Sequence, residues 1–197
     1  MPRGKTTRVE LRKQMIRMLL DRYGCMTIGD IMAMTGMSHT HAFYVLQSIG
    51  LPRAVAGNVF IVCATEEHMQ RYMDAVVDSL TCAACRMGLR YIWPGRLAIY
   101  RETWSALQEE LERRLAAAGG FVVPKVIKYP SAAALTFMKA LLNYAAKTGR
   151  AEVVVRKKRH DVIKIACPPD CTPSRPWRRL RRRSIWSFSP SGYILDG

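Results

Sequence analysis

Several features are scarce in this sequence, and each scarcity excludes a class of protein or of site. No apolar run approaches the roughly 18 residues that a membrane-spanning helix needs. The first residues, Met-Pro-Arg-Gly-Lys, lead into a charged segment and lack the apolar core of a signal peptide. We therefore expect a cytoplasmic protein, associated with a nucleoid or a ribonucleoprotein, and no membrane partner.

Catalytic patterns are also missing. The sequence contains no glycine-rich phosphate loop, no His-Glu metal-binding helix and no nucleophile elbow. Only 15 Asp and Glu occur in 197 residues, and none are paired at a spacing suited to two-metal catalysis. We expect a protein that is not an enzyme.

Acidic residues are outnumbered by 31 Lys and Arg, which gives a formal net charge of +16 at pH 7. About half of the residues are hydrophobic, so the chain can form a core and is not merely a basic tail. The excess is densest between Arg156 and Arg183, where 11 Lys and Arg face only two acidic residues. A folded, strongly basic protein favours polyanions, because neutralising phosphates releases counterions.

The first 63 residues carry a recognisable order of elements. An apolar pattern predicts a helix over 9–22, with Leu11, Met15, Ile16, Met18 and Leu19 facing inward. A short extended segment, a helix at 28–34, a turn at Gly36, a Ser38-capped helix at 39–48 and a hairpin at 53–62 follow. The segment "MTGMSHTHAFYVLQSIGL" resembles the winged helix-turn-helix DNA-binding family.

That resemblance implies a recognition helix in the major groove of a duplex. Its outward face would present polar side chains able to hydrogen-bond base edges or phosphates, with one cation at the base of the wing: His39, Thr40, His41, Tyr44, Gln47 and Arg53. The helix itself has no Lys or Arg, so a solvated face on a protein-binding winged helix is the alternative.

Residues 102–167 are expected to repeat the order. A helix at 102–118 has Trp104, Leu107, Leu111 and Leu115 on one face, a second helix starts after Ser131, and two strands flank a basic tip. Residues 124–130 leave little room for a middle helix. The resemblance to a second winged helix implies that cations on the helix after Ser131 and at the basic tip contact nucleic acid: Lys139, Lys147, Arg156, Lys157, Lys158 and Arg159.

Two other segments complete the expected organisation. A helix at 65–81 has a broad apolar stripe, which suggests packing or a homodimer through these residues. The tail at 168–197 interleaves cations with aromatic rings, which suits phosphates and unpaired bases: Arg175, Trp177, Arg178, Arg179, Arg181, Arg182 and Arg183.

Six cysteines occur. Cys82 and Cys85, with Cys167 and Cys171, form two pairs at knuckle-like spacings, and four thiolates suit one structural zinc ion. Disulfides and unconnected thiols are the alternatives. The scarcity of Asn and Gln is typical of thermophiles, in which intracellular disulfides occur. Cys25 and Cys63 are expected in the core of the first module.

Together these patterns predict a mostly α fold with small β-hairpins (α+β): tandem winged helix-turn-helix modules at 1–63 and 102–167, joined by a central helix and small hairpin at 64–101, and a basic extended C-terminal tail at 168–197. The function predicted is nucleic-acid binding, with double-stranded DNA favoured over RNA and a role as transcriptional regulator or architectural protein. The rivals are an RNA-binding component of a ribonucleoprotein and a protein-binding scaffold.

Overall fold

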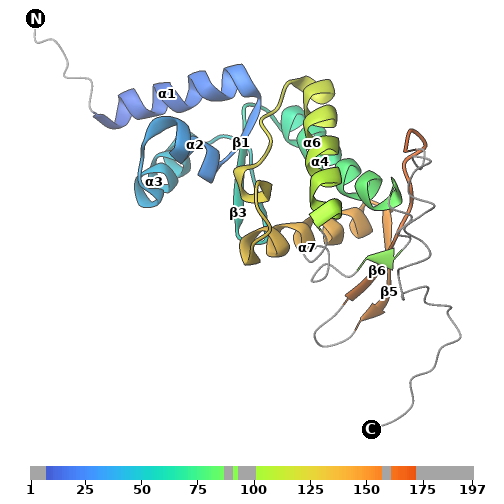
Figure 1. Ribbon diagram of the computed structural model, residues 1–197. Coiled ribbons are helices and arrows are strands. Elements are labelled where there is room, and N and C mark those ends of the chain that lie inside the picture. Colours follow the sequence, from blue (N-terminus) through green and yellow to red (C-terminus); the bar gives the residue numbers. More distant parts are fainter. Residues whose placement is uncertain (1–7, 87–90, 93–100, 157–160, 172–197) are drawn as a thin grey trace, which may run out of the picture.

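The computed structural model describes residues 8–86, 91–92, 101–156 and 161–171 (Figure 1). Within these residues the protein is mostly helical, with two small antiparallel sheets, as the composition and periodicity predict. None of the described helices is long and apolar enough to cross a membrane.

The N-terminal part contains three helices and one sheet, in the predicted order. It comprises α1 (Arg8–Tyr23), β1 (Cys25–Thr27), α2 (Ile28–Thr35), α3 (His39–Ile49), β2 (Arg53–Ala56) and β3 (Val59–Cys63). The sheet order is β1-β3-β2, with both pairings antiparallel. Thr27 and Asp30 form a capping box at the start of α2, and Gly36 ends that helix in the left-handed region.

The prediction of which residues of the first helix face inward was right for Ile16 and wrong for three of the others. Ile16 and Leu20 are buried in the N-terminal core, whereas Leu11, Met15 and Met18 are exposed. A helix with apolar residues on two sides offers two candidate inward faces, and the periodicity alone favoured the larger one.

Helix α4 (Glu66–Arg86) lies at the centre of the remaining structure. It packs side by side with α6 (Arg101–Gly119), and the two helices are seen together in Figure 1. The α6 side chains predicted to face inward are buried, as are thirteen residues of α4. The apolar stripe at 65–81 is thus covered within the chain by α6 and α7, which is the first of its two predicted uses, packing.

The C-terminal part contains η1 (Lys125–Ile127), α7 (Ala132–Lys147), β5 (Ala151–Arg156) and β6 (Asp161–Ile165). The short segment after Pro124 forms one turn of 3-10 helix in place of a regular middle helix. The third strand of this sheet is β4 (Tyr91–Ile92), which precedes α6 and pairs with β6, so the order is β4-β6-β5.

Candidate nucleic-acid interface and the cysteine-linked centre

The outward face of α3 is the best-formed candidate for contact with a ligand. Ser38 caps the helix by accepting from the backbone N–H of His41, and the opposite face buries Ala42, Val45 and Leu46 in the core. All the polar side chains predicted on this helix are exposed: His39, Thr40, His41, Tyr44 and Gln47. The helix therefore presents hydrogen-bonding groups, two imidazoles among them, and neither Lys nor Arg.

The hairpin that follows α3 is not a free-standing wing. Gly57 at its tip has a φ of +65°, and a Cβ placed there would lie 2.7 Å from the carbonyl oxygen of Thr136 on α7. The tip is therefore pressed against α7, which sequence reasoning did not foresee. Arg53, at the base of the hairpin, is exposed as expected.

Helix α7 carries two of the predicted cationic contacts. Lys139 and Lys147 are both exposed. Lys147 borders an open groove of about 390 Å³ between β2, α4 and α7, and this groove was missed because its walls come from three distant segments. Both apolar and polar side chains line it, and Gln70 of α4 donates to the hydroxyl of Tyr144 there, at 3.1 Å.

The most basic predicted contacts lie largely outside the described residues. Arg156 ends β5, but its side chain is not described. The rest of the second wing tip and the whole basic tail lie beyond what the structure describes: Lys157, Lys158, Arg159, Arg175, Trp177, Arg178, Arg179, Arg181, Arg182 and Arg183.

All six cysteines are joined in disulfides. Cys25 and Cys63 are directly opposite each other on β1 and β3, fully buried and bonded. The sulfurs of Cys82 and Cys85, one helical turn apart on α4, bond to those of Cys171 and Cys167. The four residues predicted to converge do so, and the two bonds fasten the segment after β6 to the end of α4.

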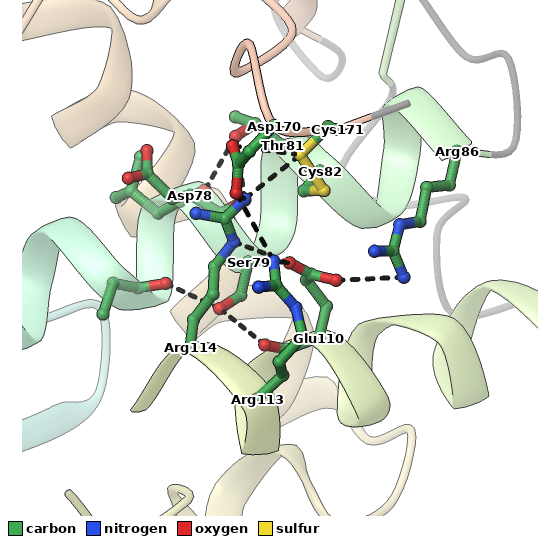
Figure 2. Close-up of polar contacts among 12 residues, drawn as sticks. Asp78, Ser79, Thr81, Cys82, Arg86, Glu110, Arg113, Arg114, Asp170 and Cys171 are labelled. Atoms are coloured by element: carbon green, nitrogen blue, oxygen red, sulfur yellow. Dashed lines mark hydrogen bonds and ion pairs between the residues drawn. A yellow bond between two sulfur atoms is a disulfide. The ribbon is translucent and has the colours of Figure 1, made fainter. Parts of the chain in front are cut away.

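A buried ion network surrounds the Cys82–Cys171 disulfide (Figure 2). Glu110 of α6 has no exposed side-chain surface, and its carboxylate pairs with Arg86 at 3.1 Å, with Arg114 at 2.6 Å and with Arg113. Arg114 also pairs with Asp170 at 2.6 Å and lies 3.1 Å from the sulfur of Cys171. Burial acts to raise the pKa of Glu110, but the hydrogen bonds from Arg113 and Arg114 outweigh it, so the net pKa is lowered.

This environment does not fit the zinc ion that the spacing suggested. Sulfurs in disulfides are not the thiolates that zinc requires. The group with the right proximity is Cys82, Cys171 and the Glu110 carboxylate, whose ligand atoms lie within 4.8 Å of one another. That carboxylate is already engaged by three guanidinium groups, which would repel a divalent cation. The centre is a covalent and ionic link between α4, α6 and the segment after β6.

Comparison with known proteins gives one informative likeness. No protein-family profile and no curated protein sequence matches the chain. A crystal structure of the hypothetical protein PyrSV_gp04 from Pyrobaculum spherical virus superposes with a TM-score of 0.59 at 20% sequence identity. The match covers 80% of this chain and 94% of the viral one. At this identity the likeness concerns the fold alone: this chain is similar in fold to a viral protein of undescribed function.

Proposed function

We propose that this protein binds double-stranded DNA through a winged helix-turn-helix at its N-terminal end. The observation that carries the proposal is the outward face of α3: the five polar side chains that a recognition helix would present to base edges are all exposed on one capped helix. The order of α1 to β3 and the sheet order β1-β3-β2 support the same reading.

The second half forms a reduced counterpart of the first in this proposal. Its sheet order β4-β6-β5 parallels β1-β3-β2, but the middle helix is one 3-10 turn and the first strand comes from before α6. Because the β2–β3 hairpin packs against α7, both halves would contact the same DNA together. Lys139 and Lys147 then supply phosphate contacts beside the first wing, and the basic segments at 157–160 and 172–197 supply most of the remaining affinity.

The direct test measures binding to duplex libraries. Full-length protein is incubated with random 30-base-pair duplexes, and bound sequences are selected and quantified by fluorescence anisotropy against random DNA and against structured RNA. A regulator selects particular duplexes, and an architectural protein binds duplexes without selection. Preference for RNA, or no nucleic-acid binding, overturns the proposal in favour of a ribonucleoprotein component or a protein scaffold.

Substitutions on α3 test which surface makes the contact. Gln47→Ala and Tyr44→Ala remove exposed side chains without touching the core, and each is expected to weaken binding to a selected duplex about 10-fold to 100-fold, since a good base contact contributes about 1–3 kcal/mol. Gln14→Ala on α1 is the matched control, since it removes an exposed amide from the same module. Equal effects of the three substitutions would exclude α3 as the reading surface.

A further inference from the structure

The two disulfides at the end of α4 differ in exposure. Cys167 is exposed, whereas its partner Cys85 is 4% exposed. In the second disulfide both residues are buried, since Cys82 has no exposed surface and Cys171 is 6% exposed. Thiol–disulfide exchange requires direct attack on a sulfur atom. A thiol arriving from solvent therefore reacts first at the sulfur of Cys167.

Attack at that sulfur creates a nucleophile close to the second disulfide. The electron pair of the broken S–S bond goes to Cys85, which becomes a thiolate. Cys82 is three residues away on the same face of α4, and its sulfur is bonded to Cys171. Cys-X-X-Cys is the spacing of redox-active cysteine pairs that bond each other. Cys85 also lies in the last turn of α4, where a helix most readily allows the small displacement that such a bond needs.

The ion network makes the two sulfurs of the second disulfide unequal (Figure 2). The guanidinium of Arg114 lies 3.1 Å from the sulfur of Cys171, so it stabilises a thiolate there. Asp170 has an oxygen 3.9 Å from the same sulfur, and an oxygen of Glu110 lies within 4.8 Å of it. Both carboxylates are paired with arginines, and three arginines against two carboxylates leave the network with one positive charge. Because a better stabilised thiolate leaves faster, Cys82 is the sulfur attacked and Cys171 the sulfur that leaves.

We propose that these four cysteines form a thiol–disulfide relay, which accepts a small monothiol at Cys167 and releases Cys171. In the first step the thiolate bonds to Cys167, and Cys85 leaves. In the second step Cys85 bonds to Cys82, and Cys171 leaves as a thiolate beside Arg114. The number of disulfides is unchanged, because one mixed disulfide at Cys167 and one bond within α4 replace the two original bonds. The proton of the thiol goes to solvent, and no other oxidant or reductant is consumed.

The relay makes the attachment of the segment after β6 to α4 dependent on thiols. One thiol molecule removes both covalent links, and the ion pair between Arg114 and Asp170 remains. Cys171 directly precedes the basic residues 172–197, so loss of both bonds detaches from α4 the point at which those residues begin. The inference does not rest on DNA binding, and either can fail while the other stands.

The experiment treats the oxidised full-length chain with equimolar 2-mercaptoethanol at about pH 8, quenches it in denaturant with iodoacetamide, and maps the cysteines by mass spectrometry. Trypsin places Cys82 and Cys85 in one peptide and Cys167 and Cys171 in another, so loss of both links separates the two peptides. We expect an internal disulfide in the first peptide. In the second we expect mercaptoethanol on Cys167 and carbamidomethyl on Cys171. Alkylated Cys82 and Cys85, an adduct on Cys171, or an intact Cys82–Cys171 bond beside modified Cys167 overturns the proposal.

Removing the entry disulfide distinguishes a relay from simple loosening of the segment. In the double variant Cys85→Ser, Cys167→Ser, the remaining disulfide should open at least about 10-fold more slowly than in the wild type. Its two residues are buried, and no internal thiolate is left to attack it. Equal or faster opening overturns the relay, because it means that the first disulfide merely held the segment in place.

Substitution of Arg114 tests the leaving group. Arg114→Gln should slow the second step about 10-fold and leave the first unchanged, and Arg114→Lys should restore part of the rate. Arg113→Gln is the matched control, since Arg113 pairs with the same two carboxylates, Glu110 and Asp170. Equal rates of the second step in Arg114→Gln and Arg113→Gln overturn the role of Arg114 in releasing Cys171.

Discussion

Replacing Glu110 by Gln tests whether the ion network around this buried carboxylate stabilises the packing of α4, α6 and the segment after β6. The change keeps the shape of the side chain and removes its charge. Three guanidinium groups then face an amide that accepts fewer hydrogen bonds, and Arg114, which is 13% exposed, is the one least able to reach water.

The magnitude follows from burial. Removing one partner of a buried ion pair typically costs 3–5 kcal/mol, because the remaining charge is left uncompensated. Arg113 and Arg86 are half and one-third exposed and can be hydrated, and Arg114 keeps Asp170. We therefore expect a loss of about 2–3 kcal/mol in the free energy of unfolding, somewhat below that range.

Urea denaturation of the oxidised protein at pH 7 measures this loss, with circular dichroism as the readout. Glu109→Gln is the control, since Glu109 is the exposed neighbour on the same helix and should change stability by less than about 0.5 kcal/mol. The pKa of Glu110 is lowered in the folded protein, so its stabilising contribution is present above the ordinary value of 4.5 and is lost as pH falls through the folded pKa. The difference between wild type and variant should shrink below pH 4.5. A loss at pH 7 equal to that of the control, or one unchanged at low pH, would refute the reasoning.

Three further predictions concern other parts of the chain. Under a mild thiol reductant, the disulfide with the exposed Cys167 should be reduced before the fully buried link between β1 and β3, as mass spectrometry after alkylation will show; simultaneous reduction would contradict it. Gly57→Ala should cost about 2–3 kcal/mol in thermal unfolding, since it adds a clash with Thr136 to an unfavourable φ, whereas Gly50→Ala, with open space around it, should cost about 1 kcal/mol. Burial raises the pKa of Asp30, so its ionisation disfavours the folded state as pH rises through that pKa, and stability should show this decline in wild type and lose it in Asp30→Asn.

Local patterns predicted the local structure well. The Ser38 cap and Gly36 turn delimited α3, and its polar face was assigned correctly because every contact that defines it lies within a few residues. Apolar periodicity likewise identified the buried side of α6. Periodicity cannot say what covers a face, however. The stripe on α4 was therefore left open between packing and a dimer, although α6 and α7 cover it. Leu11, Met15 and Met18 of α1 were assigned to the core, although they are exposed.

The cysteines show the same limit in chemical terms. Their spacing predicted that four would converge, which the structure has. The spacing does not say whether they carry zinc or disulfides. The charge that disfavours a divalent cation there comes from three arginines on α4 and α6, which engage Glu110. No spacing rule places Arg114 beside Cys171, because 57 residues separate them along the chain. The packing of the β2–β3 hairpin on α7 could not be predicted for the same reason, because Gly57 and Thr136 are far apart along the chain.

The distribution of charge separates affinity from selectivity in the proposed DNA complex. Glu110 and six other acidic residues are engaged in ion pairs with described Lys and Arg. The positive charge available for phosphates is therefore on other Lys and Arg, none of which lies on α3. Each phosphate contact that is lost lowers the slope of log affinity against log salt by about 1, whereas loss of a base contact leaves the slope unchanged. We therefore expect Arg53→Ala to flatten the salt dependence of binding by about one unit while affecting all duplexes alike. Gln47→Ala should weaken binding to the selected duplex at every salt concentration with no change of slope, and a flattened slope for Gln47→Ala would mean that α3 binds the backbone and does not read the sequence.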